Sequence, residues 1–348
     1  MALEDRSAVK SADIVSADFA PKVAIQQHLG GPHLDIFNRA LWNVTSTEIA
    51  EITYAQIVDG LPLADVVQDS GNAQVPLPYE HPIYDAHTEL CPGALEKTRE
   101  FRVSFDPSSL QMDATLVADY RASSPGSRAF NTRLVEMVAV AVHSIAVQLY
   151  ELGPMFHSDD GIAQWVPPKD DIWWEFNEEG AWPTLFRHAW YIDHQQYPHG
   201  VADEVGYWAE SRIFGGVVVF DRRDPRNCPD AQPDSVWLHP DREEVTYRLF
   251  QLFDEQKQDL LDFLTSESPD LKFLPIIGDK KNETREDPEE AIAELGIYRN
   301  LWERKPLPED RADYRLRDVW DGFDHLTKAD LHRSQDRAWN RKENRHRQ

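Results

Sequence analysis

Cysteine is nearly absent from this sequence. The chain has 348 residues and 2 cysteines, Cys91 and Cys228, which are far apart and form no CxxC pair. Such cysteines indicate neither a disulfide framework nor a thiolate zinc site. The first residues also carry acidic side chains where a secretion signal needs basic residues followed by an apolar run. We therefore expect a cytoplasmic protein.

Positive charge and long apolar runs are scarce as well. The 36 Lys and Arg residues face 61 Asp and Glu residues, which gives a formal net charge of −25. A chain with this balance repels the phosphates of nucleic acids and anionic membrane surfaces. The longest apolar stretch, residues 137–150, contains polar side chains and is shorter than the roughly 18 residues of a membrane span. We expect neither nucleic acid nor a membrane as a partner.

The motifs of several common enzyme classes are missing. The sequence has no GxGxxG after a predicted strand, no GxxxxGK(S/T), no GxSxG and no HExxH. These absences argue against the commonest nucleotide-binding proteins, serine hydrolases and zinc proteases. No cofactor is expected.

The apolar patterns that are present predict an α+β fold. We expect one large domain over residues 21–325, in which a small, mostly antiparallel sheet packs against several long amphipathic helices. Residues 1–20 are expected to form a flexible tail. Residues 326–348 form a basic tail, in which Lys328 to Gln348 contain 7 Lys or Arg and 3 Asp or Glu, so that 7 − 3 = +4. This tail is either an arm that docks on the acidic body of the protein or on a protein partner, or a solvated helical tail.

Individual elements follow from periodicity and capping signals. A strand at 100–105 is predicted because Phe101, Val103 and Phe105 alternate with polar residues, and a long helix from Asp241 because Glu244 completes a capping box. The other predicted elements are helices at 46–59, 131–151, 201–210 and from 287 onward, and strands at 111–119, 212–221 and 236–239. Residues 61–93 and 156–200 are expected to be irregular.

The predicted helix at 131–151 carries a polar stripe on an otherwise apolar surface. The stripe consists of Arg133, Glu136, His143, Ser144, Gln148 and Glu151. If it faces a cleft, His143 is suited to act as a general acid or base, because the pKa of histidine lies near physiological pH. Glu136, two turns away, would line the same cavity. The stripe is also consistent with a solvent-exposed face or with a core histidine bonded to a carbonyl group.

A second set of candidate residues lies on the predicted helix at 201–210. Asp203 and Glu210 share one helical face, with Gly206 between them. The glycine leaves a notch in which a backbone or a ligand can approach closely. Carboxylates near a buried strand are candidates for acid–base catalysis, and structural salt bridges with nearby arginines are the alternative. The glycine pair at 215–216 indicates a bulge or a close contact with another element.

Aromatic residues gather in the stretch that precedes and includes this helix. The candidate substrate-binding residues are Trp173, Trp174, Trp182, Trp190 and Tyr207. Large rings wall pockets for flat apolar ligands, and they also anchor irregular segments to a core.

The same stretch contains His188, Asp193, His194 and His199. Imidazole and carboxylate groups suit zinc or non-haem iron. Their spacing matches no common metal motif, however, so no metal ligand is predicted with these residues.

Several segments resemble a known group of proteins. The run 197–221, together with residues 237–240 and the helix at 131–151, resembles an uncharacterised family of cytosolic proteins from filamentous fungi. The resemblance covers about residues 80–265. It implies a fungal origin and transfers no catalytic motif; secondary metabolism is the context in which many such fungal proteins occur.

Three functions are compatible with these observations. The leading hypothesis is a cofactor-independent acid–base enzyme, of the isomerase, dehydratase or cyclase type, that acts on an apolar or aromatic small molecule. In this hypothesis His143 works with Glu136, Asp203 or Glu210. The alternatives are a non-catalytic binding or accessory protein, which uses the basic tail, and a metal-dependent oxygenase or hydrolase, which uses the histidines between residues 188 and 199.

Overall fold

A computed structural model describes most of the chain. The described residues are 21–70, 77–157, 160–175, 177–243 and 245–305, together with residues 327, 329, 332 and 333. The predicted tail at 1–20 and nearly all of the tail at 326–348 lie outside the described residues. So does Glu244, which the predicted capping box includes.

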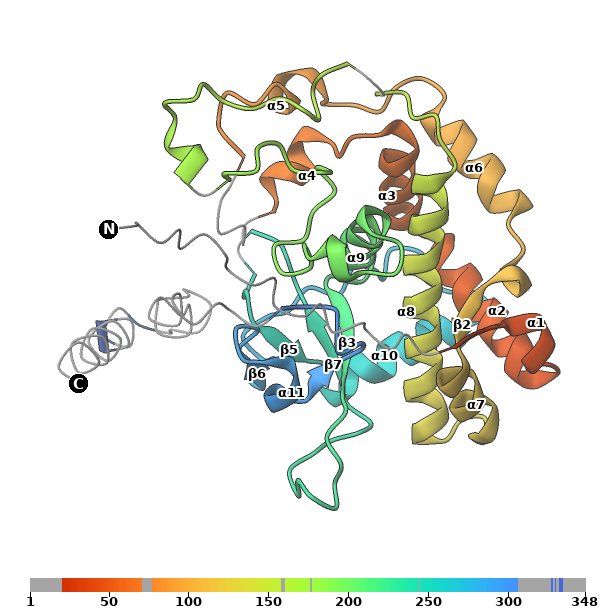
Figure 1. Ribbon diagram of the computed structural model, residues 1–348. Helices are drawn as coiled ribbons and strands as arrows, with labels where there is room; N and C mark the ends of the chain where they lie inside the picture. The colour runs from red at the N-terminus through yellow and green to blue at the C-terminus, as the bar shows by residue number, and fades with distance from the viewer. Residues whose placement is uncertain are drawn as a thin grey trace, which may run out of the picture.

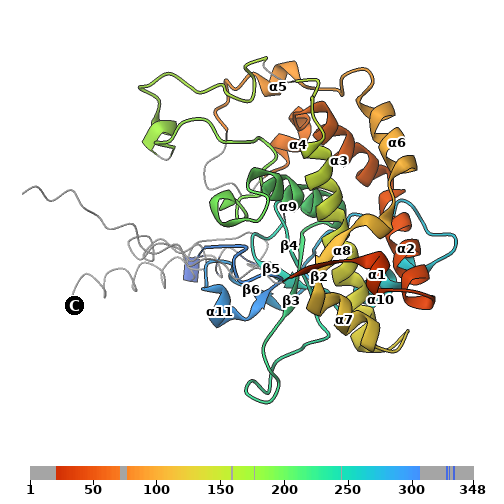
Figure 2. The same cartoon turned by 45° about the vertical axis from the view of Figure 1, so that its right-hand side comes forward.

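The described part of the chain has an α+β fold, as predicted. One antiparallel sheet has the strand order β6-β5-β4-β3-β7, and a second sheet pairs β1 with β2. The strands of the large sheet are β3 (Val217–Asp221), β4 (Val236–His239), β5 (Leu249–Gln251), β6 (Arg285–Glu286) and β7 (Ile297–Tyr298). The small sheet consists of β1 (Lys22–Ala24) and β2 (Gln111–Asp113), and it lies beside α1 and α7 (Figure 2).

Helices surround the large sheet on several sides (Figure 1). In chain order they are α1 (Ile25–His28), α2 (Pro32–Thr45), α3 (Glu48–Asp59), α4 (Ala64–Gln68), α5 (Ile83–Ala86), α6 (Ala94–Ser104), α7 (Ala114–Ala122), α8 (Arg128–Glu151), α9 (Val201–Phe214), α10 (Asp254–Thr265) and α11 (Ile292–Leu295). Short 3-10 turns occur at η1 (Pro107–Ser109), η2 (Ile172–Glu175) and η3 (His194–Gln196).

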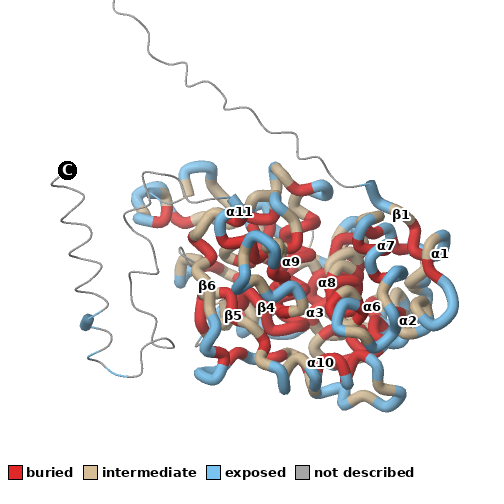
Figure 3. Tube along the Cα trace, turned by 90° about the horizontal axis from the view of Figure 1, so that it is seen from below, coloured by how far each residue is buried: buried red, intermediate tan, exposed pale blue. Residues whose placement is uncertain are grey.

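The centre of the molecule is built from α8 and α9. The longest helix, α8, begins after Ser127, whose hydroxyl accepts a hydrogen bond from the backbone of Phe130. It packs along α9, which in turn contacts α3 and β3 (Figure 1). Every residue of α9 after Val201 is buried, and buried residues concentrate around these two helices (Figure 3). Helix α8 also has the length and hydropathy of a membrane span, although 67% of its most apolar window is buried inside the protein.

Glycine fixes the junction between α9 and β3. The predicted strand at 212–221 is wrong in its first part, because α9 continues to Phe214 and ends at Gly215 in a left-handed conformation. A Cβ atom at Gly215 would lie 2.0 Å from the carbonyl oxygen of Ile276. The close contact predicted for the glycine pair is therefore confirmed. The strand predicted at 236–239 is present as β4, in which Leu238 pairs with Val218 of β3 in antiparallel register.

Two predicted strands near the N-terminal third are wrong in whole or in part. Residues 100–104 belong to α6, which ends at the C-cap residue Phe105; the rings of Phe101 and Phe105 stack at 5.4 Å while Val103 is exposed. Phe101 and Phe105 are four residues apart, which is the spacing of neighbours on one side of a helix, and the exposed Val103 between them produced the apparent alternation. Residues 111–119 divide into β2 and the first part of α7. The loop predicted at 61–93 contains the short helices α4 and α5.

Of the two helices predicted in the C-terminal third, the one from Asp241 begins later than predicted and the one from 287 does not start there. Residues 249–251 form β5, and the helix starts only at Asp254. Asp241 caps no helix; its carboxylate accepts hydrogen bonds from Ser70 and from the backbone of Ala189 instead. The carboxylate of Asp241, which was predicted to cap a helix, therefore bonds to residues distant in the sequence instead. After Asp287 the described chain forms only the short helix α11 before residue 305.

Candidate active site

A pocket of about 410 Å³ lies along α8. Helix α8 contributes the whole polar stripe that the sequence singled out: Arg133, Glu136, His143, Ser144, Gln148 and Glu151. The other walls come from β2 and α7, from α9 through Asp203 and Tyr207, and from the segment that follows β7. The structure thus places the stripe on a cavity rather than on an open solvent-exposed face.

The imidazole of His143 lies between two carboxylates on this pocket wall. Its Nε2 atom is 3.0 Å from Oδ1 of Asp203, and its Nδ1 atom is 3.6 Å from Oε2 of Glu210. The side chain of His143 is 12% exposed, and its ring meets Tyr207 edge-on at 4.6 Å. The structure therefore brings together four residues that the sequence placed on two separate helices.

The two carboxylates make the imidazole more basic. Burial, the largest influence, lowers the pKa of His143, but the interactions with Asp203 and Glu210 outweigh burial and raise the pKa above its ordinary value. For Asp203, burial is the largest influence and raises the pKa, but the hydrogen bond and charge of His143 and the interactions with His199 together outweigh burial, so that the pKa is lowered. The other oxygen of Asp203 accepts the backbone N–H of His199 at 2.7 Å. The pair is thus arranged to hold a proton on the ring.

Glu210 is anchored behind the imidazole by a buried arginine. Both oxygens of its carboxylate accept hydrogen bonds from Nη1 of Arg299 at 2.8 Å, and one also accepts the backbone N–H of Val218 at 2.7 Å. Glu210 and Arg299 are buried, and Arg299 reaches the pocket. No local pattern in the sequence indicates Arg299, because 89 residues separate it from Glu210.

Gly206 provides the space that the imidazole occupies. It lies on the α9 face between Asp203 and Glu210, and a Cβ atom built there would be 2.5 Å from Nε2 of His143. The notch predicted from the sequence therefore exists, and it accepts a side chain of α8. This contact is what allows α8 and α9 to approach closely enough for both carboxylates to reach one ring.

We expect Gly206→Ala to lower the free energy of unfolding by about 1–3 kcal/mol, because the new methyl group collides with the His143 ring. The effect is expected despite the higher helix propensity of alanine. Urea denaturation checks whether this collision is the cause. It is applied to Gly206→Ala in the wild-type protein and in a His143→Ala background. Without the ring, the same substitution should be neutral or stabilising. An equal loss in both backgrounds would contradict the assignment.

Glu136 lines the same pocket but contacts different partners. Its carboxylate pairs with the guanidinium groups of Arg133 and Arg222. Two cations therefore share one anion at this end of the pocket, and both arginine side chains are partly exposed. Glu136 is in no contact with His143, so its predicted role as a catalytic partner of the imidazole has no direct geometric basis.

The predicted aromatic wall lies elsewhere, except for Tyr207. Trp173 and Trp174 belong to η2, and the indole of Trp174 donates to the backbone of Pro167. Trp182 donates to Asn177 and lines a separate pocket beside α4. Trp190 packs near His239 and Tyr247. Among the described residues, Tyr207 and Trp302 are the large aromatic rings that line the pocket of His143.

The four residues considered as metal ligands do not converge. His188 donates to the carbonyl oxygen of His239, and His194 pairs with Glu204 at 2.8 Å. Asp193 accepts the backbone N–H of Lys305, and His199 lies next to Lys22. Each side chain has its own partner in a different direction, so these four described residues share no coordination site.

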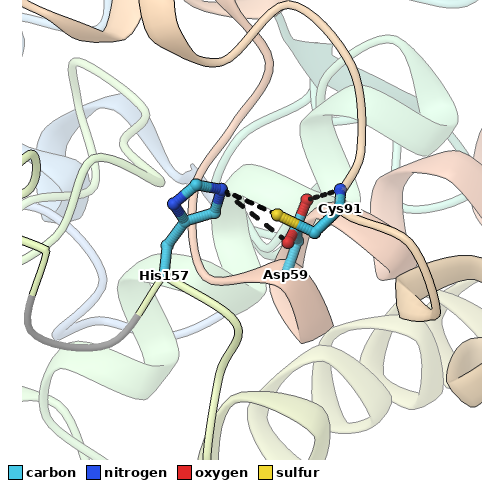
Figure 4. Close-up of side chains that lie close together, drawn as sticks. All are labelled: Asp59, Cys91 and His157. Atoms are coloured by element: carbon cyan, nitrogen blue, oxygen red, sulfur yellow. Dashed lines mark hydrogen bonds and ion pairs between the residues drawn. The ribbon is translucent and has the colours of Figure 1, made fainter.

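A different cluster was missed altogether by the sequence analysis. Asp59, Cys91 and His157 come from three distant segments and lie side by side (Figure 4). Their ligand atoms are all within 4.8 Å of one another. Neither a CxxC pair nor a histidine motif marks these positions, because the fold alone brings them together.

Comparisons of the chain with protein-family models, with curated proteins and with solved structures gave no match. The resemblance to the fungal family therefore stays a prediction.

Proposed function

We propose that the protein is an enzyme that transfers protons to and from a small molecule in the pocket along α8. His143 is the proton-carrying group, and Asp203 and Glu210 orient its ring. The observation that carries this proposal is the position of the imidazole, 3.0 Å from one carboxylate and 3.6 Å from the other, on the wall of a cavity of about 410 Å³. Isomerisation, dehydration and cyclisation are the reaction classes that such a group supports.

The geometry around His143 suits general acid–base catalysis. A histidine that gains or loses a proton near neutral pH transfers protons efficiently in both directions. Asp203 and Glu210 stabilise the protonated ring, so that the proton stays available as pH rises above the ordinary pKa of histidine. Because Arg299 neutralises Glu210, the acidic residue behind the ring keeps its position without repelling Asp203.

The walls of the pocket support a substrate with an apolar body and an acidic group. Met112, Leu116, Val140 and Val147 form an apolar side of the pocket. At the other end of the stripe, Arg133 and Arg222 both pair with Glu136, and their two partly exposed guanidinium groups are the proposed donors to a carboxylate of the ligand. This substrate class replaces the aromatic-walled site of the sequence-based hypothesis, because the four predicted tryptophans, Trp173, Trp174, Trp182 and Trp190, do not line the pocket.

Solvent deuterium exchange tests the proposal even while the product is unidentified. The purified protein is incubated in D2O with a panel of small carboxylic acids that carry a C–H group next to a carbonyl, and deuterium incorporation is followed by proton NMR. We expect at least one member of the panel to exchange faster with the protein than with buffer. Absence of exchange with every member, under conditions in which the protein is folded, would contradict the proposed chemistry for this substrate class.

The alternative of an accessory protein depends on the basic tail, nearly all of which lies outside the described residues. No contact in the described part of the chain favours it.

A further inference from the structure

Three chain segments meet at the cluster of Asp59, Cys91 and His157. Asp59 is the last residue of α3, Cys91 lies just before α6, and His157 follows α8. Figure 4 shows the carboxylate, the thiol and the imidazole turned toward one another. The Sγ atom of Cys91 is 3.1 Å from Nε2 of His157, which in turn is 3.9 Å from Oδ1 of Asp59.

The backbone is shaped to bring these segments into contact. Gly60 has a φ of 108°, and a Cβ atom there would lie 2.9 Å from Cβ of Met155. The segment that carries His157 can therefore pass directly over the end of α3, where the backbone N–H of His157 donates to the carbonyl oxygen of Asp59 at 2.9 Å. Gly93, with a φ of 99°, makes a similar close contact with the ring of Phe156.

One oxygen of Asp59 has no hydrogen-bond partner among the described residues. Oδ2 accepts the backbone N–H of Cys91 at 2.9 Å and pairs with Nε2 of His87 at 3.0 Å. Oδ1 is buried, points toward the thiol and the imidazole, and accepts no hydrogen bond from the described part of the chain. A buried carboxylate oxygen without a donor is costly, and a cation bound between these three groups would satisfy it.

The groups around the cluster hold it in the manner of a metal site. Metal-binding histidines usually donate their second ring N–H to a carboxylate. Here Nδ1 of His157 lies 2.6 Å from Oδ2 of Asp160. The second oxygen of Asp59 is fixed by Cys91 and by His87, whose Nδ1 donates to the carbonyl oxygen of Pro62 at 2.9 Å. The imidazole and the carboxylate are therefore positioned by groups outside the cluster, and the backbone of Cys91 is held by Asp59.

We propose that Asp59, Cys91 and His157 bind a zinc ion. Thiolate sulfur, imidazole nitrogen and carboxylate oxygen are all zinc ligands, and tetrahedral zinc would separate such atoms by about 3.4–3.6 Å. The observed separations of 3.1 Å and 3.9 Å lie on either side of that value. Three protein ligands leave the fourth position for water or a substrate, and the partly exposed side chains of His157 and Asp160 give solvent a path to it.

Two titrations of the full-length protein test the proposal, after bound metal has been removed with a chelator. One is a spectroscopic titration with Co²⁺, and the other is a calorimetric titration with Zn²⁺. We expect one equivalent of either ion per chain, and a near-ultraviolet absorption band from a cobalt–thiolate bond. Cys91→Ser should abolish the band and weaken zinc binding by at least about 100-fold. The matched control is Cys228→Ser, which changes the other cysteine and should leave both unchanged.

A second variant covers the case in which Cys91→Ser fails to fold. His157→Gln keeps the thiol and should still weaken zinc binding by at least about 10-fold. The proposal would be overturned by no stoichiometric zinc binding by the wild-type protein, by bound Co²⁺ without a thiolate band, or by unchanged zinc affinity in folded variants of both ligands. Rapid alkylation of Cys91 in the presence of zinc would instead indicate a reactive thiol paired with His157 and would also contradict the site.

Discussion

Arg299→Met is expected to lower the free energy of unfolding by about 3–5 kcal/mol, because it leaves the carboxylate of Glu210 buried without its counter-ion. Glu210 has no exposure to solvent, and both of its oxygens accept hydrogen bonds from Arg299, while Val218 donates to one of them and His143 lies near the other. Methionine fills a similar volume without supplying a charge, so the loss reports on electrostatics more than on packing. Equilibrium denaturation in urea measures the change.

Two further variants establish the cause of that loss. Glu210→Gln combined with Arg299→Met removes both charges and should recover part of the stability that Arg299→Met loses. Arg226→Met removes an arginine whose ion pair with Asp224 is exposed at the surface, and it should leave the denaturation midpoint almost unchanged. Equal losses from Arg299→Met and Arg226→Met would show that Arg299 does not neutralise a buried charge.

The second large effect concerns proton transfer. His143→Gln should reduce the rate at which the substrate exchanges deuterium with solvent at least about 100-fold. The glutamine amide still forms hydrogen bonds, but it neither gains nor loses a proton near neutral pH and so cannot act as an acid or base. Proton NMR of the exchanging substrate measures the rate in the wild-type protein and in the variant. Circular dichroism and the thermal midpoint establish that the variant is folded.

A histidine outside the pocket serves as the matched control for this experiment. His28 lies at the end of α1 and does not line the pocket, so His28→Gln should exchange the substrate at the wild-type rate. Wild-type exchange by folded His143→Gln would assign the chemistry to another group.

Local sequence patterns predicted those parts of the molecule that local interactions determine. The helices predicted at 46–59 and 131–151 are present as α3 and α8, although their N-caps, Thr47 and Ser127, differ from the predicted starts. The two strands of the β3–β4 pair follow from two short apolar runs on either side of a polar loop. The face of α9 that contacts His143 was also predictable, since Asp203, Gly206 and Glu210 repeat at helical spacing. The identity of the side chain in the notch required the packing of α8 against α9, which no single helix reveals.

Long-range contacts explain what the sequence did not predict. Arg299 reaches Glu210 only because β7 pairs with β3 and brings the following segment against α9. Asp59 and His157 meet because left-handed glycines let two distant segments approach. The tryptophans between residues 173 and 190 have the composition of a pocket wall, yet the indoles of Trp174 and Trp182 bond to nearby backbone and side chains instead. Composition identified the residue types, and the topology determined their partners.

The pH titration of His143 by NMR, in protein labelled with ¹⁵N at histidine, tests the central claim most directly. His143→Gln assigns the ring signals. We expect a titration midpoint above 6.5, because Asp203 and Glu210 stabilise the protonated ring, and a lower midpoint in Asp203→Asn. A wild-type midpoint at or below 6.5, or one that Asp203→Asn leaves unchanged, would contradict the claim that these carboxylates hold a proton on the imidazole.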